Sequence, residues 1–88
     1  MDGRWYVYVL RCADDSLYVG TSADLEARVA CHNNGKGAKY TRSRRPVRLV
    51  YRETCDSRNT ALAREREIKG WRREKKEKLI AGFLRRTE

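Results

Sequence analysis

The chain has 88 residues, and its 21 Lys and Arg against 12 Asp and Glu give a formal net charge of +9. A chain of this length forms one modest core, so we expect a single domain over residues 1–88. The basic excess predicts nucleic acid as the partner, with a generally soluble basic protein as the alternative. No apolar run reaches the roughly 18 residues of a membrane span, and the first ten residues lack a signal-peptide pattern, so we expect no membrane association.

The first predicted element is a β-hairpin. Residues 5–11 and 16–20 are rich in β-branched and aromatic types, and the "ADDS" between them favours a turn. Because side chains alternate along a strand, the two tyrosines of "YVYV" share one face of the hairpin and its two valines share the other.

A helix is predicted next, over residues 23–33. Thr21 and Asp24 have the spacing of a helix-capping pair, and Ser22 is a competing cap. Gly35 suits the left-handed position beyond the last turn.

The basic segment, residues 35–46 with the sequence "GKGAKYTRSRRP", is predicted to form a loop or a short irregular helix. It carries five basic side chains, one aromatic ring and no acidic residue. Pro46 opens a third predicted strand over residues 47–53, in which Val47, Leu49 and Tyr51 alternate with their neighbours.

Two helices complete the chain. The first, capped by Asp56 or Ser57, runs to about Lys69, and the second covers roughly residues 73–84. The order β-β-α-β-α-α predicts an α+β fold, with a small three-stranded, mostly antiparallel sheet flanked by helices. The apolar side chains of the last helix pack either on its own domain or against a protein partner; they are Leu79, Phe83 and Leu84.

Glu65 is the first candidate site residue. It lies between Leu62 and Ile68 on the apolar stripe of its helix, where an ionised carboxylate is unfavourable unless it is paired or binds a metal. An ion pair with one of the many arginines is one interpretation. A ligand for a hard cation such as Mg²⁺ is the other.

Further candidates come from the helix and the hairpin. Arg28 and His32 lie one turn apart and form either a solvated helix face or a pair that neutralises a phosphate and transfers a proton. Tyr8 and Tyr18 lie on adjacent hairpin strands, where they either pack or help to deprotonate water near an arginine and a metal.

A family resemblance joins these candidates. "YVY" at residues 6–8 and "YVG" at residues 18–20, with Arg28 ten residues after Tyr18 and His32 four further on, resemble the motifs of the GIY-YIG nucleases. The basic segment and "ALAREREIKGW" are similar to the corresponding parts of small stand-alone bacterial members, so the resemblance runs from about Trp5 to Ile80. One departure is a tyrosine and a valine at the first motif, where the name-giving sequence has glycine and isoleucine.

The resemblance implies a metal-dependent endonuclease that hydrolyses DNA with low sequence specificity. Single-stranded or branched DNA in repair or recombination is one candidate substrate. It implies Mg²⁺ or Mn²⁺ as the cofactor and no small-molecule cofactor. The alternatives are a non-catalytic nucleic-acid-binding module of the same fold and a nuclease subunit that requires a partner.

The resemblance also assigns roles. Tyr8 and Tyr18 are the motif tyrosines, and either of them, or His32, is a candidate general base. Arg28 stabilises the charge of the phosphate. Glu65 is the metal ligand, with Glu67 as a competing alignment. The residues expected to bind substrate are Lys36, Lys39, Tyr40, Arg42, Arg44 and Arg45, of which Tyr40 is placed to stack on an exposed base.

The spacing of the cysteines argues against zinc binding and thiol catalysis. Cys12, Cys31 and Cys55 show no close C-x₂₋₄-C pair, which argues against a zinc site. An odd number of unpaired cysteines is typical of the reducing cytoplasm, where we expect the protein.

Overall fold

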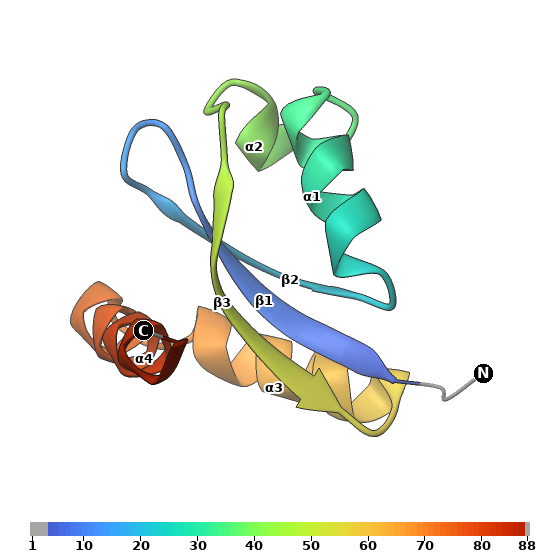
Figure 1. Ribbon diagram of the computed structural model, residues 1–88, viewed down its shortest axis with the longest axis vertical. Coiled ribbons are helices and arrows are strands. Elements are labelled where there is room, and N and C mark those ends of the chain that lie inside the picture. Colours follow the sequence, from blue (N-terminus) through green and yellow to red (C-terminus); the bar gives the residue numbers. More distant parts are fainter. Residues whose placement is uncertain (1–3, 88) are drawn as a thin grey trace.

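A computed structural model describes residues 4–87, which form a three-stranded antiparallel sheet and four helices (Figure 1). The elements are β1 (Trp5–Arg11), β2 (Leu17–Ser22), α1 (Leu25–Asn33), α2 (Lys39–Arg42), β3 (Arg48–Cys55), α3 (Arg58–Lys69) and α4 (Arg73–Thr87). The predicted α+β class and element order are confirmed, and the basic segment contains the short helix α2.

The sheet has the order β2-β1-β3, so the first strand is central. Figure 1 shows α1 and α2 on one side of the sheet and α3 and α4 on the other. Tyr8 lies on this central strand, where it pairs with Gly20 of β2 on one side and with Arg52 of β3 on the other.

Each face of the sheet has its own apolar cluster, as the alternation of "YVYV" predicts. Val7 and Val9 belong to the cluster beneath α3 and α4, whereas Tyr8 lies in the cluster beneath α1, with Tyr6 packed against it. The hairpin alternation is therefore confirmed, and it directs the Tyr8 side chain to the same face as α1.

The predicted alternation of the third strand is wrong in its first half. Leu49 is 36% exposed, whereas Val50 is only 4% exposed and joins the core with Tyr51. The cause is a bulge: Val9 pairs with Tyr51 but Leu10 pairs with Leu49, so Val50 is an extra residue without a partner. The strand also starts one residue later and ends two residues later than predicted.

The helix starts correct two expectations. Asp24 is the N-cap of α1 and accepts a hydrogen bond from the Ala27 amide at 3.2 Å, so neither Thr21 nor Ser22 caps this helix. Both belong to β2, which extends two residues beyond the predicted strand. At α3, Ser57 rather than Asp56 is the cap.

An ionic network fastens α4 to the hairpin. The Arg11 guanidinium donates two hydrogen bonds to the Glu77 carboxylate, at 2.6 and 3.0 Å. Arg73 bonds the same carboxylate at 3.0 Å and reaches Asp15 in the hairpin turn at 3.1 Å. Since Arg11 and Glu77 are both partly buried, this pairing is stronger than an exposed ion pair.

The apolar face of α4 packs on its own domain. Leu79 and Phe83 lie against the core, and the Phe83 ring meets Tyr51 at 5.4 Å between centroids. Leu84 is 42% exposed. The helix is longer than predicted and reaches Thr87. Within residues 4–87, none of the helices has the length and apolar character needed to cross a membrane.

Candidate active site

The Tyr8 hydroxyl is the meeting point of the predicted catalytic side chains. Its ring lies across Gly20 of the neighbouring strand: a Cβ at Gly20 would be 2.5 Å from the Tyr8 hydroxyl. Only glycine leaves room for the ring here. The second motif, "YVG", therefore positions the tyrosine of the first.

A directed chain of hydrogen bonds runs from Tyr8 through His32. The Tyr8 hydroxyl lies 3.0 Å from His32 Nε2, and His32 Nδ1 lies 2.8 Å from Thr41 Oγ1. Thr41 donates its single hydroxyl proton to the Ala38 carbonyl at 2.9 Å. The threonine must therefore accept from Nδ1–H, which leaves Nε2 as the acceptor of the Tyr8 proton.

His32 has no solvent-exposed surface, which excludes the predicted alternative of a solvated helix face for this residue. The basic segment covers it: α2 supplies Thr41, and the backbone at Gly37 passes so close that a Cβ there would collide with the imidazole. The two ring nitrogens thus face the hydroxyls of Tyr8 and Thr41 rather than solvent.

Arg28 lies one turn before His32 on α1, and its interaction with Tyr8 raises the pKa of the guanidinium. Burial raises the pKa of Tyr8 to about 12, against the opposing effect of the Arg28 hydrogen bond. Burial also lowers the pKa of His32, and the positive charge of Arg28 lowers it further. His32 is consequently neutral at pH 7, and its Nε2 lone pair is available.

The Tyr18 ring lies between the hydrogen-bonded pair Tyr8 and His32 and the basic segment. Its ring centroid lies 6.4 Å from that of Tyr8, 5.2 Å from that of His32 and 6.1 Å from that of Tyr40, on which it stacks. Unlike Tyr8, it is only half-buried. Of the two motif tyrosines, Tyr18 is the one with more open surface.

Glu65 approaches Tyr8 from the opposite layer. It belongs to α3, which lies on the other face of the sheet from α1 but contacts both β1 and β2. Its negative charge nevertheless acts on Tyr8 and contributes to the raised pKa of that hydroxyl. The carboxylate and the hydroxyl therefore interact although their elements lie on different faces, because the Tyr8 ring extends across Gly20 of the edge strand β2.

Glu65 and its competitor Glu67 have different surroundings. The Glu65 side chain is 15% exposed and pairs with Lys69 at 2.5 Å. Glu67 is 55% exposed and pairs with Arg64, which also binds Glu53 on β3 at the other edge of the sheet. Of these two carboxylates, Glu65 is the one whose charge acts on the Tyr8 pKa.

A divalent metal fits this carboxylate in its chemistry. Glu65 offers hard carboxylate oxygens next to a tyrosine hydroxyl, and Mg²⁺ commonly binds through one or two carboxylates with water and phosphate oxygens. Across residues 4–87 there is no group of three or more His, Cys, Asp and Glu side chains able to hold a metal. A metal at Glu65 would take its other ligands from water and from a phosphate, and it would displace Lys69.

The predicted substrate-binding residues divide into two groups. Lys36, Lys39, Tyr40 and Arg42 are exposed and make no ion pair in the part of the chain that the structure describes. Arg44 and Arg45 are held by the protein itself. Arg44 pairs with Asp14 at 3.1 Å and covers the Tyr40 ring at 4.0 Å, whereas the exposed Arg45 donates to the backbone carbonyls of Asn33 and Arg42. One face of the Tyr40 ring is thus occupied by Arg44.

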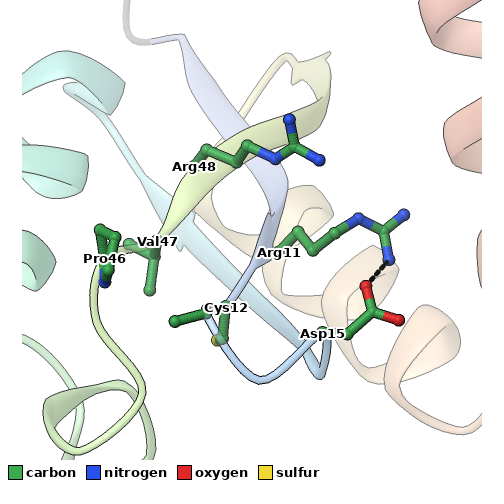
Figure 2. A pocket seen from close by; sticks show the side chains of 7 residues that line it. Arg11, Cys12, Asp15, Pro46, Val47 and Arg48 are labelled. Carbon is green, nitrogen blue, oxygen red and sulfur yellow. Dashed lines mark hydrogen bonds and ion pairs between the residues drawn. The ribbon is translucent and has the colours of Figure 1, made fainter.

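A separate hollow of about 340 Å³ lies between the end of β1 and the start of β3 (Figure 2). Figure 2 shows Arg11 directed at Asp15 along one wall, with Cys12 beneath and Arg48 above. None of the predicted catalytic residues lines this hollow. Cys12 is a free thiol, as are Cys31 and Cys55.

The sequence analysis missed three residues of this site. Thr41, Gly37 and Lys69 each contact a predicted catalytic side chain. The four-residue spacing of Glu65 and Lys69 was a usable signal, because it predicts a pair on one helix face. Thr41 and Gly37 gave no signal, since their contacts arise from the path of the basic segment over α1.

Comparison with known proteins agrees with the geometry. The family model of the GIY-YIG catalytic domain matches residues 4–78, a range that contains every candidate catalytic residue. A UPF0213 protein of Staphylococcus saprophyticus is 55% identical over 78 residues, covering 89% of this chain and 95% of the relative. A UPF0213 protein of Haloquadratum walsbyi is 54% identical over 79 residues, covering 90% of this chain and 89% of the relative.

Two solution NMR structures are similar in fold and sequence. The UPF0213 protein BH0048 of Bacillus halodurans is 45% identical with a TM-score of 0.57, covering 89% of this chain and 83% of that one. The protein EF2693 of E. faecalis is 36% identical with a TM-score of 0.62, covering 96% of this chain and 92% of that one. The resemblance read from the motifs is confirmed: the chain belongs to the GIY-YIG family, whose catalytic domain is a nuclease domain.

Proposed function

We propose that this protein is a divalent-metal-dependent endonuclease that hydrolyses phosphodiester bonds of DNA with low sequence specificity. The observation that carries the proposal is the convergence on the Tyr8 hydroxyl. A buried imidazole hydrogen-bonds to it, and a guanidinium and a carboxylate from opposite layers both act on its pKa. The net charge of +9 favours a polyanionic substrate.

Arg28 and Glu65 act on the scissile phosphate, one directly and one through a bound metal. The Arg28 guanidinium, half-buried beside Tyr8, donates to a phosphate oxygen and stabilises the charge that builds during cleavage. Glu65 holds Mg²⁺ or Mn²⁺, which when bound supplies Lewis-acid activation of the scissile phosphate. Lys69, released from Glu65, remains as a second cation close to the substrate.

Tyr8 and His32 move the proton as a pair. His32 is fully buried and its Nε2 faces the Tyr8 hydroxyl, so Tyr8 relays the proton of the attacking water to it. Tyr8 accepts that proton as it passes its own to Nε2, 3.0 Å away. The raised pKa of Tyr8 keeps its hydroxyl protonated until transfer occurs, and the lowered pKa of His32 keeps the acceptor neutral. Tyr18, the more exposed ring, orients the water.

The exposed cations of the basic segment hold the DNA backbone. Lys36, Lys39 and Arg42 are free to contact phosphates, and such contacts carry no base information. This accounts for low sequence specificity. Arg44 and Arg45 contribute instead by fixing the shape of the segment.

The test is cleavage of labelled single-stranded, duplex and branched DNA by the purified protein, with Mg²⁺ and with EDTA. We expect Mg²⁺-dependent cutting that Arg28→Ala or Glu65→Gln lowers by about 10²-fold or more. Glu67→Gln is the matched control, on the same helix, and it should cut at the wild-type rate. Binding of DNA without Mg²⁺-dependent cutting would identify a non-catalytic module and refute the proposal.

A further inference from the structure

Two adjoining hollows open beside the candidate active site, on the side of Tyr40. The first, about 260 Å³, is lined by Leu17, Tyr18, Val19, Tyr40, Lys69 and Lys76. The second, about 170 Å³, is lined by Ser16, Leu17, Tyr40, Arg73 and Lys76. Because they share Leu17, Tyr40 and Lys76, they form one depression, which we name the α4 groove.

The α4 groove combines an apolar floor with cationic walls. Leu17, Tyr18 and Tyr40 provide aliphatic and aromatic surface, and no acidic side chain of residues 4–87 lines either hollow. Lys69 and Arg73 are engaged in ion pairs with acidic side chains outside the lining. The Lys76 ammonium, by contrast, makes no ion pair with any residue that the structure describes. The groove therefore offers a half-buried positive charge to an anionic ligand.

The groove is continuous with the candidate active site through two of its residues. Tyr18 lines the groove and also meets the His32 ring at 5.2 Å. Lys69 lines the groove and also pairs with Glu65. A strand that leaves the scissile position in this direction enters the groove directly.

We infer that the α4 groove binds an unpaired stretch of the DNA strand adjoining the cleaved bond, with a phosphate on Lys76 and a base on the surface of Leu17 and Tyr40. This inference rests on the proposed nuclease function and names the strand state of its substrate. Leu17, Lys69 and Lys76 lie outside the basic segment, so the groove extends the substrate contact from Tyr40 of that segment onto β2, α3 and α4.

The chemistry of the floor selects an unpaired strand. In a duplex the base faces are stacked on one another and the base edges are paired, so apolar protein surface gains little from contact with them. Unpaired bases expose both, and single-strand grooves join aromatic surface for bases with cations for the backbone.

The test measures binding of a short labelled oligonucleotide, single-stranded and as a duplex of the same sequence, in EDTA over a series of salt concentrations. Lys76→Ala should weaken single-strand binding and flatten its logarithmic salt dependence by about 0.7, the value for one phosphate contact. Lys78→Ala is the matched control: it removes the same charge from an exposed position of the same helix. It should leave single-strand affinity nearer to that of the wild type.

The aromatic floor has its own variants. Tyr40→Ala should lower single-strand affinity by about 5-fold, the low end of the range for loss of a base–aromatic contact, because Arg44 and Tyr18 already lie against the ring. Tyr40→Phe retains the ring and should bind nearly as well as the wild type. The duplex should be affected less by both Lys76→Ala and Tyr40→Ala.

Equal effects of Lys76→Ala and Lys78→Ala, or equal losses for single strand and duplex, would overturn the inference. Because binding is measured in EDTA, its outcome is independent of cutting. Groove-dependent single-strand binding without Mg²⁺-dependent cleavage would refute the nuclease proposal alone. Cleavage that proceeds while the groove variants bind normally would refute the groove alone.

Discussion

Thr41 is a sensitive point of the site, because its hydroxyl determines which nitrogen of His32 carries the proton. Thr41→Val keeps the side-chain shape and removes the acceptor that Nδ1–H uses at 2.8 Å. A buried N–H left without an acceptor is unfavourable by about 1–3 kcal/mol, so the folded protein should lose stability in that range. The ring can relieve the penalty by moving its proton to Nε2, but Nε2 then no longer accepts from Tyr8. We expect cleavage to fall by about 10²-fold or more.

The assay has three readouts. Urea unfolding gives the stability change. Because His32 is the single histidine of the chain, a ¹⁵N NMR spectrum of the imidazole reports its tautomer without overlap. Thr41→Ser retains a hydroxyl and should restore both the Nδ1–H tautomer and most of the activity, which a purely structural role would not require. If Thr41→Val kept the Nδ1–H tautomer and the wild-type cleavage rate, the reasoning about this hydrogen-bond chain would be wrong.

Three further predictions concern glycine positions and pH. Gly20→Ala places a Cβ 2.5 Å from the Tyr8 hydroxyl, so it should destabilise the fold by about 1–3 kcal/mol in urea unfolding and slow cleavage by displacing that hydroxyl. Gly82→Ala, in α4 with open space around it, should instead stabilise by about 0.5–1 kcal/mol, and a loss of stability there would contradict the assigned surroundings. The pKa of His32 is lowered in the folded state, so below the unfolded pKa of about 6.5 the unfolded chain binds a proton that the folded chain does not. The free energy of unfolding should therefore fall as the pH drops through this range. His32→Gln should lose that part of the pH dependence.

The fold was largely predictable because its signals are local. The alternation of "YVYV" correctly divides the hairpin between two apolar clusters, and the helices follow from caps and apolar spacing. The errors arise where tertiary pairing overrides the local pattern. The bulge opposite Val9 and Leu10 inserts Val50 into the core, and β2 runs on through Thr21 because it pairs with Val7 of the central strand.

The sequence identified which residues form the candidate site, but it did not predict the contacts between them. Motif spacing identified Tyr8, Arg28 and His32, and the structure brings them together at one hydroxyl. Spacing left open whether His32 faces solvent, since its burial depends on how the basic segment crosses α1. The hydroxyl of Thr41 acquires its role only through that crossing, so no pattern along the chain pointed to it.

The division of the site between the two layers of the molecule has a consequence for the growing polypeptide. The phenols, the guanidinium and the imidazole all precede residue 33, whereas the acidic residue on α3 follows more than thirty positions later. A ribosome-bound or prematurely ended product therefore carries the groups that grip a phosphate while lacking the group proposed to hold the ion. On the proposed mechanism, such fragments do not cleave nucleic acid until α3 packs against the sheet and supplies Glu65.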